Sequence, residues 1–484
     1  MRSRTVRTAL LAATLLGGAA GARADDLREA LVMAYNTNPD LLAARANQRA
    51  TDEGVPIAKA AGRPSVNGSA SYTEFVKKSA NSFTAPDRAL DAQVQLGVPV
   101  YAGGAVRNSV KAAETRVEAG QADLRGTESA IFSQVVAAYM DVIRDQAIVG
   151  LNRNNVEVLE VNLRATSDRF EIGDLTRTDV AQSNSRLALA RGDLRTAEAN
   201  LIASRERYIQ VVGKVPVNLQ PPPPLPGLPA SVDEAVAIAL ENNPDLIAAR
   251  ERSKAAGYDI DVAGAGRLPT ISVFTGGDYT DYLGTLGGSA GGNFTQRQTT
   301  AQVGVRASIP IFQGGLPAAR ERQAQARAGV TLEQEIAVER DVIAQVRSAY
   351  SSWQAANEII VMNQTAVDAA ALSLEGVRAE NTVGNRTILN ILDAEQELLR
   401  AQVQLVAARR SAYVAGFSLL AAMGRAEAQD LGLDGGALYN PETNYDRVKG
   451  KWNDWAHDPD PKAQATRTVD TPAQNATIPG PVVP

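Results

Sequence analysis

The chain has 484 residues, no cysteine, a single histidine and a formal net charge of −5. The absence of cysteine excludes disulfides and thiolate metal sites, and the acidic balance argues against nucleic acid as a partner. The only histidine, His457, lies in a proline-rich stretch far from any cluster of metal-binding or nucleophilic residues. The sequence therefore predicts neither an enzyme nor a cofactor.

The first 24 residues have the pattern of an export signal. Arg2, Arg4 and Arg7 precede an apolar run, and Ala22-Arg-Ala24 has the small-x-small form of a signal-peptidase site. Beyond this segment no run of about 18 apolar residues could form a spanning helix, so a membrane crossing would require β-strands. No cysteine follows the signal to carry a lipid anchor. We expect an exported and unlipidated chain.

Two segments about two hundred residues apart are nearly the same, which indicates a duplication. Residues 29–45 and 234–250 share an Asn-Pro-Asp-Leu opening that begins at Asn38 and at Asn243. We expect one repeat over 25–220 and a second over 231–424, joined by a proline-rich linker at 221–230. Residues 425–484 are rich in proline and lack heptads, so they are expected to be irregular or disordered.

Each repeat contains one strongly alternating strand. From Leu90 to Val100, and again from Ala301 to Ile311, apolar residues occupy every second position over a length that crosses a bilayer at a tilt. A weaker strand precedes each, which predicts β-hairpins at about 66–101 and 270–312. A half-buried soluble sheet is the alternative. About four strands cannot close a barrel, so either structure needs other chains or other cover.

After each hairpin the apolar period becomes helical. Residues 104–172 contain no proline, and a helix of that length would be on the order of 100 Å long. Gly173 and Gly384 are natural reversal points, which predicts helical hairpins at about 103–212 and 314–423. Residues 40–62 and 174–212 together nearly match 104–172 in length, so one long helix should run beside two short ones stacked end to end.

Heptads follow the two reversal points. A Leu/Ala seam of this kind favours coiled-coil packing over an ordinary amphipathic helix in a bundle. The seam positions are Val180, Leu187, Leu194, Leu201 and Tyr208 in the first repeat, and Ile391, Leu398, Leu405, Ala412 and Leu419 in the second.

Several motifs in this order resemble the TolC family of outer-membrane efflux and secretion channels, over about 27–424. They are the paired Asn-Pro-Asp-Leu openings, the second tip at 383–387, the segment 391–396, and the paired strand-to-helix corners Pro99, Gly103 and Gly104, and Pro310, Gly314 and Gly315. The resemblance implies a mainly α protein with a membrane β portion. In it, three chains form a twelve-stranded outer-membrane β-barrel continuous with a periplasmic α-barrel tunnel of coiled-coil hairpins.

The resemblance also implies a function and partners. The trimer would be a passive exit duct of a tripartite efflux pump or a type I secretion system in a Gram-negative bacterium. A periplasmic adaptor would dock at the hairpin tips near Gly173 and Gly384, and an inner-membrane pump would supply the energy. The sequence does not distinguish small-molecule cargo from polypeptide.

The family closes its tunnel at the tips. If the family's tip contacts are transferred to the matching positions of this chain, Arg386 would donate hydrogen bonds to Thr178 and Asp179. The hydrogen bonds of a guanidinium–carboxylate pair are directional and charge-assisted. Without the resemblance these would be solvated tip residues, whose pairs contribute about 0–1 kcal/mol.

The family also narrows its tunnel with a ring of aspartates, to which Asp393 would contribute. Two positions depart from the pattern. Asn390 replaces the other constriction acid and Asn381 replaces the usual gate tyrosine. We expect weaker cation affinity at the entrance and a less tightly closed state.

Other classes of protein fit less well. A periplasmic coiled-coil adaptor or a structural rod that transports nothing is the main alternative, but an adaptor would not duplicate strands and hairpin together. A hydrolase that uses two carboxylates is not excluded by composition, although the acids lie on heptad exteriors as solvated residues do. The glycine-rich segment 284–292 lacks the Lys-Ser/Thr of a phosphate-binding loop and is interpreted as a surface loop.

Overall fold

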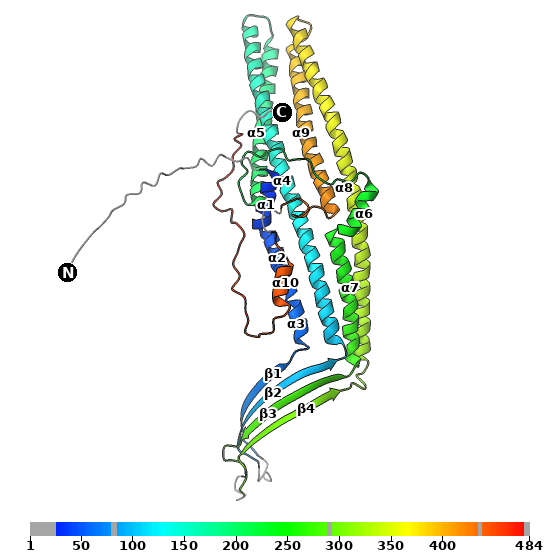
Figure 1. Ribbon diagram of the computed structural model, residues 1–484. Coiled ribbons are helices and arrows are strands. Elements are labelled where there is room, and N and C mark those ends of the chain that lie inside the picture. Colours follow the sequence, from blue (N-terminus) through cyan, green and yellow to red (C-terminus); the bar gives the residue numbers. More distant parts are fainter. Residues whose placement is uncertain (1–25, 79–84, 288–292, 434–437, 479–484) are drawn as a thin grey trace, which may run out of the picture.

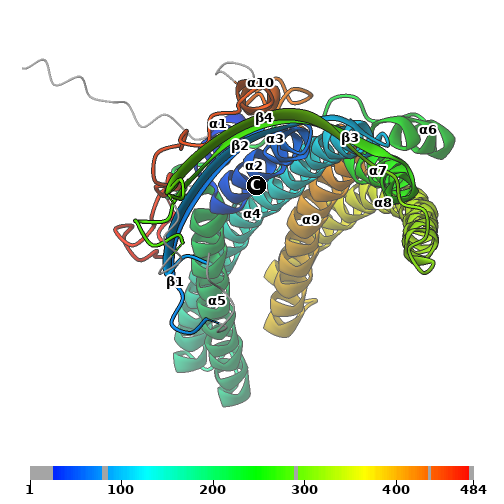
Figure 2. The same ribbon diagram turned by 90° about the horizontal axis from the view of Figure 1, so that it is seen from below.

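The computed structural model describes residues 26–78, 85–287, 293–433 and 438–478, so the predicted export signal lies outside the described residues. The molecule is elongated, with a four-stranded sheet at one end and the tips of two helical hairpins at the other (Figure 1). Seen along its length, the sheet and the helices follow one arc (Figure 2).

The two repeats have the same order of elements. The first contains α1 (Leu27–Thr37), α2 (Pro39–Asp52), α3 (Gly54–Ala60), β1 (Ser65–Glu74), β2 (Arg88–Ala102), α4 (Ala105–Glu171) and α5 (Arg177–Val212). The second contains α6 (Val232–Asn242), α7 (Pro244–Gly264), a 3₁₀ turn (Ala265–Arg267), β3 (Thr270–Asp281), β4 (Arg297–Ser308), α8 (Leu316–Thr382) and α9 (Ile388–Ala422). A last helix, α10 (Glu442–Val448), follows outside the repeats.

The long helices predicted from the absence of proline are present. Helices α4 and α8 each contain 67 residues. Helix α5 packs on the tip half of α4, while α2 and α3 pack on its sheet half (Figure 1). In the second repeat α9 and α7 occupy the same two places beside α8. The predicted arrangement of one long helix beside shorter stacked ones is confirmed.

The Asn-Pro-Asp motif joins the stacked helices. The Oδ1 atom of Asn38 caps α2 by accepting a hydrogen bond from the backbone N–H of Asp40 at 2.9 Å. The Nδ2 atom of the same side chain donates to the carbonyl oxygen of Val211, in the last turn of α5, at 3.0 Å. Asn243 repeats the pattern at the start of α7 and donates to Ala422 O, at the end of α9, at 2.9 Å. One side chain thus satisfies backbone groups at both facing helix ends, which have no partners within their own helices.

The two predicted β-hairpins form one antiparallel sheet in the order β1-β2-β3-β4. The central pair, β2 and β3, joins the repeats, and Val94 lies opposite Gly68 on one side and Gly277 on the other. Strands β1 and β4 each pair on one side only among the described residues. The sheet therefore has two open edges.

The predicted end of the second strong strand was wrong. Alternation suggested a strand through Ile311, but β4 ends at Ser308, which pairs with the first residue of β3, Thr270. Residues beyond Ser308 have no β3 residue opposite them, and Pro310 removes a backbone donor. In the first repeat β2 continues to Ala102 because β3 supports it, with a register shift next to Pro99.

Paired glycines turn the chain from strand to helix in both repeats. Gly103 and Gly104 have φ of 61° and 82°, and Gly314 and Gly315 have φ of 59° and 83°. Two successive left-handed residues are costly for any side chain other than glycine. At Gly103 a Cβ would lie 2.8 Å from the Cβ of Leu268, so this corner also needs glycine for space.

The main hydrophobic core lies at mid-height, where α1, α4, α5, α8 and α9 meet. Its largest fully buried side chains include Phe132, Tyr139, Tyr208 and Phe417. Most of the predicted heptad seam is buried, which confirms that it faces the neighbouring helices; the buried members are Leu187, Leu201, Tyr208, Ile391, Leu405, Ala412 and Leu419.

The C-terminal tail returns along the outside of the first repeat. Asn444 of α10 donates to Asp52 of α2 at 2.6 Å, and Arg205 of α5 donates to Thr477 O at 2.9 Å. The stretch predicted to be irregular thus contains one short helix and is tied to α2 and α5.

Among the described residues, no helix combines the length and the apolar character that crossing a bilayer requires.

Candidate gate at the helical tips

The two hairpin tips are built alike. Gly173 and Gly384 both have φ of 83°. In the first tip the N–H of Asp174 donates to Arg169 O at 2.9 Å, and in the second the N–H of Asn385 donates to Glu380 O at 3.0 Å. These bonds close the end of each long helix with the left-handed glycine that such an ending favours. The reversal points predicted from glycine are confirmed.

A capping box starts the descending helix of each hairpin. Asp179 accepts from the backbone N–H of Thr176 at 2.9 Å and from its hydroxyl at 2.7 Å, while Asn390 makes the same two contacts with Thr387 at 3.1 and 2.9 Å. The bonds from Thr176 hold the pKa of Asp179 below its usual range. The predicted gate residue Asp179 and the predicted constriction residue Asn390 therefore also fix the local fold of the tips.

The chain alone does not bring the predicted gate pair together. Arg386 donates from Nε to Glu380 Oε2 at 2.6 Å, within its own tip. Thr178 is exposed, and within the described part of the chain no hydrogen bond joins Arg386 to Thr178 or Asp179. Asn381, which stands where the family pattern has tyrosine, donates to Arg386 O at 2.7 Å and so supports the tip that carries Arg386.

Asp393 is already paired within the chain. Arg186 of α5 donates from Nη2 to Asp393 Oδ1 at 2.7 Å, and from Nη1 to Gln396 one turn along α9. Asp393 keeps 61% of its side chain exposed, so the carboxylate faces solvent with a cation beside it. Arg186 could not be identified from the sequence, because nothing local in α5 indicates which residue of α9 it faces.

A second residue that sequence analysis did not single out is Glu395. It is buried and lies three positions after the buried Leu392, on the face of α9 that packs against α4 and α5. A buried acid is unusual, because buried carboxylates need partners. Its place four residues after Ile391 is outside the predicted seam, so the heptad pattern gave no signal that it is buried.

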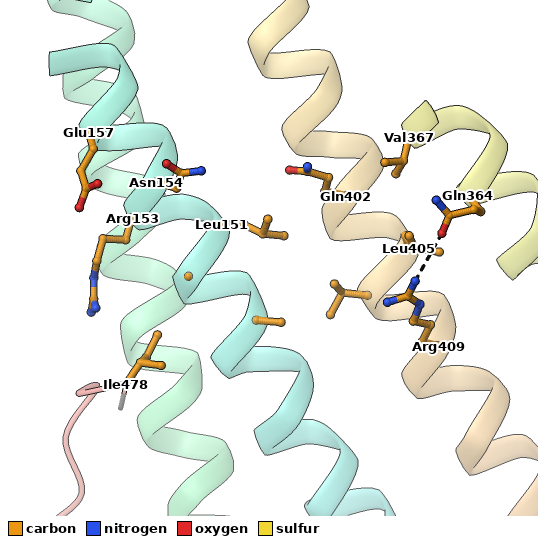
Figure 3. Close-up of a pocket in the computed structure, with 13 residues that line it drawn as sticks. Leu151, Arg153, Asn154, Glu157, Gln364, Val367, Gln402, Leu405, Arg409 and Ile478 are labelled. Carbon is orange, nitrogen blue, oxygen red and sulfur yellow. Dashed lines mark hydrogen bonds between the residues drawn. The ribbon is translucent and has the colours of Figure 1, made fainter. Parts of the chain in front are cut away.

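A groove separates the two hairpins between the mid-height core and the tips. It has a volume of about 680 Å³ and is lined by α4, α8, α9 and the tail residue Ile478. Figure 3 shows Leu151 of α4 pointing toward α9 and Gln402 of α9 pointing toward α4 across it, while Leu405 lies on the side of α9 that faces α8. The two hairpins are thus in contact on both sides of the groove, through the mid-height core and through the cluster around Leu392.

The family model described as "Outer membrane efflux protein" matches residues 30–214 and 235–425, which are the two repeats. The chain belongs to the outer membrane efflux protein family. It is an outer-membrane channel of the efflux and secretion type, and this family and fold are those of channel proteins rather than of known enzymes.

Curated relatives in the family cover nearly the whole chain. The outer membrane efflux protein BepC of Brucella suis biovar 1 is 36% identical over 443 residues, which is 92% of this chain and 94% of BepC. The outer membrane protein TolC of Escherichia coli K12 is 27% identical, over 91% of this chain and 90% of TolC. The TolC resemblance inferred from the paired motifs is confirmed.

A solved structure of the family supports the fold. The CmeC outer membrane channel of Campylobacter jejuni superposes with a TM-score of 0.73 at 16% identity, covering 88% of this chain and 89% of CmeC. At this identity the likeness concerns the fold alone.

Proposed function

We propose that three copies of this chain form one exit duct, closed at the hairpin tips by contacts between copies. The observation that carries the proposal is that the two outer strands of the sheet, β1 and β4, each have an edge that is unpaired among the described residues. Strand β1 is exposed along all ten of its residues, and β4 is exposed at all but one of twelve. Unpaired strand edges of this length are rarely left free, because their backbone groups pair readily with another chain. Pairing β4 of one copy with β1 of the next would close a twelve-stranded barrel.

Helix α8 supports the same assembly. Its exposed large apolar residues include Val361, Met362 and Leu372, with exposures of 67, 66 and 70%. Such residues on an edge helix are suited to a neighbouring hairpin. The curvature seen along the length places α8 at one end of the arc (Figure 2), where the next copy would continue the wall.

The gate would then form between copies. Arg386 stands on the second tip and Asp179 on the first, and the second tip of one copy would meet the first tip of the next. The bonds from Thr176 to Asp179 use Oδ2, which leaves Oδ1 to accept from a neighbouring Arg386, with Thr178 beside it. Exposed pairs of this kind are individually weak, at about 0–1 kcal/mol, so three of them form a gate that a docking partner can open.

The constriction would contain three Asp393 carboxylates, each with its own Arg186. This pairing and the neutral Asn390 both reduce the negative charge of the ring. The ring would therefore bind multivalent cations weakly, and removing Arg186 would strengthen that binding.

An adaptor that docks near Gly173 and Gly384 would displace the tip contacts, and an inner-membrane pump would drive the transport. The chain itself would be passive. The relatives that match this chain include both an efflux protein and a protease-secretion protein. The pump that the duct works with would therefore determine whether the cargo is a small molecule or a polypeptide.

Single-channel recording in planar bilayers tests the duct and its gate. We expect a small conductance from wild type and a several-fold larger one from Arg386→Ala, because the tips then lose their contact between copies. Arg400→Ala removes an exposed arginine of the same hairpin and should behave as wild type. A well-folded trimer that never conducts would overturn the duct. Equal conductance in all three proteins would remove Arg386 from the gate.

Trivalent cation added on the tip side tests the constriction. Block should be weak in wild type, lost in Asp393→Ala and stronger in Arg186→Ala. Identical block in all three would exclude Asp393 from the pore lining.

A further inference from the structure

Two tryptophans of the C-terminal tail are almost uncovered. Trp452 is 70% exposed and Trp455 is 90% exposed, although tryptophan is highly buried on average in folded proteins. The third tryptophan of the chain, Trp353, packs against the mid-height core. Two large aromatic side chains exposed three positions apart indicate a contact with something outside the chain.

Helix α10 attaches the tail to the first repeat just before these tryptophans. Val448 is fully buried, and Tyr445 packs on a hydrophobic cluster formed by α3 and α4. The hydrogen bond of 2.6 Å from Asn444 to Asp52 of α2 adds a buried polar contact. The tail is thus held at a defined place on the repeat.

The segment that follows forms a closed turn, residues 447–458, which carries both tryptophans. Arg447 donates to the two carboxylate oxygens of Asp458, at 2.8 Å each, and so joins the ends of the turn. These hydrogen bonds lower the pKa of Asp458 to about 2, so the ends stay paired at neutral pH. Within the turn, Oδ1 of Asn453 accepts from the backbone N–H of Trp455 at 3.0 Å. The turn therefore fixes the tryptophans in place without covering them.

The turn lies beside the start of the sheet. Arg63 donates from Nη1 to the carbonyl oxygen of Lys451 at 2.6 Å, so the residue before Trp452 contacts a residue two positions before Ser65, the first residue of β1. Figure 1 shows α10 beside α2 and α3, on the sheet half of the molecule. In the proposed barrel, the ten residues of β1 are about the number that a tilted strand needs to cross the hydrocarbon layer. The membrane boundary would then lie near Ser65, at the level of the turn.

The tail also lies on the side that faces away from the proposed duct. Seen along the length of the molecule, α10 lies on the outer side of the arc that the sheet and the helices follow (Figure 2). The outer side of a membrane barrel faces lipid, and its inner side faces the lumen. Val66 and Tyr72 of β1, exposed at 67 and 56%, share one face of the strand because they are six positions apart. The turn would continue this lipid-facing surface toward the helices.

We infer that the turn at 447–458 inserts Trp452 and Trp455 into the lipid headgroup layer at the periplasmic face of the outer membrane, where they fix the depth of the duct. This role rests on the proposed function and adds to it an anchor outside the barrel. Indole rings favour the boundary between hydrocarbon and water, because the ring is apolar and its N–H needs a polar partner. Aromatic anchors at this boundary help to set how a protein sits across the bilayer.

The charges of the turn indicate what kind of lipid surface it binds. Residues 449–458 contain two lysines, Lys449 and Lys451, and two aspartates, Asp454 and Asp458, so their formal charges balance. Attraction to anionic lipid requires an excess of lysine or arginine. The turn should therefore insert into a zwitterionic lipid surface, and its insertion should depend little on salt.

The three tryptophans of the chain allow a direct test by fluorescence quenching. The purified protein is reconstituted into zwitterionic phosphatidylcholine vesicles, with or without bromine on the acyl chains, and bromine quenches indole rings that lie within the bilayer. The variant Trp452→Phe/Trp455→Phe keeps Trp353 alone, so its difference from wild type reports the two turn residues. Trp353 packs against Tyr350 at mid-height, with ring centroids 5.8 Å apart, and is the matched control.

We expect brominated lipid to remove about half or more of the fluorescence of the turn tryptophans, because interfacial anchors lie about 5–10 Å into the boundary of headgroups and acyl chains. Trp353 should lose little. Quenching should be stronger with bromine near the headgroup end of the acyl chain than near its methyl end, and it should be the same at low and high salt. Trp452→Phe and Trp455→Phe alone should each remove part of it.

Two results would overturn the anchor. If aqueous iodide quenches the turn tryptophans and brominated lipid does not, the turn stays in water. If neither reagent quenches them, a neighbouring copy covers them instead, and Trp452→Phe/Trp455→Phe would then lower the temperature at which the trimer dissociates.

A tryptophan within the sheet separates the anchor from the proposed function. Tyr72→Trp, made in the Trp452→Phe/Trp455→Phe protein, places an indole on the face of β1 that the barrel would turn toward lipid. If brominated lipid quenches this indole and not the turn tryptophans of wild type, the barrel stands and the anchor is wrong. If it quenches neither, the barrel itself fails and the anchor fails with it.

Discussion

Helices α4 and α8 have the same length and the same place in their repeats, yet 22 residues of α4 are buried and only six of α8. The difference comes from their neighbours. Helix α4 packs against α5, α7, α9 and the short N-terminal helices, whereas α8 lies at the edge of the chain. Two copies of one sequence pattern can therefore form a core in one place and an open surface in another, and we propose that the open surface of α8 is where a second copy packs.

Matched tyrosines give the largest expected difference between the repeats. Tyr139 of α4 is fully buried and donates to Gln220 O at 2.6 Å, while the equivalent Tyr350 of α8 is half-buried and donates to Ala230 O at 3.1 Å. Tyr139→Ala should lower the free energy of unfolding by about 3–5 kcal/mol, and Tyr350→Ala by about 2 kcal/mol or less. Chemical denaturation in detergent measures both. Equal losses would mean that a neighbouring copy covers α8 as closely as the chain covers α4.

Glutamates at equivalent positions of the two repeats extend the comparison to the pH dependence of stability. Burial raises the pKa of Glu128 on α4 from 4.5 to about 7, and the N–H of Ala428 donates to its carboxylate. The folded state then holds a proton that the unfolded state releases, so stability falls as pH rises from about 4.5 to 7. Above that window Glu128→Gln should be more stable than wild type by on the order of 1–3 kcal/mol, and the gain should vanish near pH 4.5.

Glu339 occupies the equivalent position on α8, so Glu339→Gln is the control for this experiment. Thermal unfolding of the three proteins between pH 4.5 and 8 gives the comparison. A pH-independent advantage of Glu128→Gln, or an equal response at Glu339, would show that burial of Glu128 is not the cause.

The smallest expected difference concerns the asparagine joints, where the repeats have the same geometry. Asn38→Ala and Asn243→Ala should each cost about 1–2 kcal/mol, because each removes a helix cap and a contact to the preceding helix end. Chemical denaturation should give the same loss of unfolding free energy for the two variants, within experimental error. A neutral effect at either position would break the equivalence that the sequence repeat implies.

The parts of the structure that depend on local chemistry were predictable from the sequence. Glycines at Gly173, Gly384 and the two strand-to-helix corners mark reversals because left-handed backbone favours glycine wherever it occurs. The heptads located the buried seam. The end of β4 was not predictable from alternation, because it depends on where the partner strand begins.

The candidate gate was only partly accessible to sequence reasoning. Asp179, Arg386 and Asp393 follow from family resemblance, but Arg186 matters only through residues of α9 more than two hundred positions away. Helical periodicity indicates which face of a helix is buried, and it does not indicate which helix lies opposite. Glu395 lies outside the heptad seam positions, so its burial could not be predicted from the sequence pattern.

The asparagine joints have a mechanical consequence. In each repeat a continuous helix of 67 residues stands beside a stack whose two pieces are bridged by an asparagine amide and share no backbone at that point. Such a stack carries compression along its axis but turns easily at the joint, since hinges form at element ends. The joint is therefore the point at which the tip half of each stack could turn against its sheet half, and the unbroken long helix beside it limits how far that turn could go.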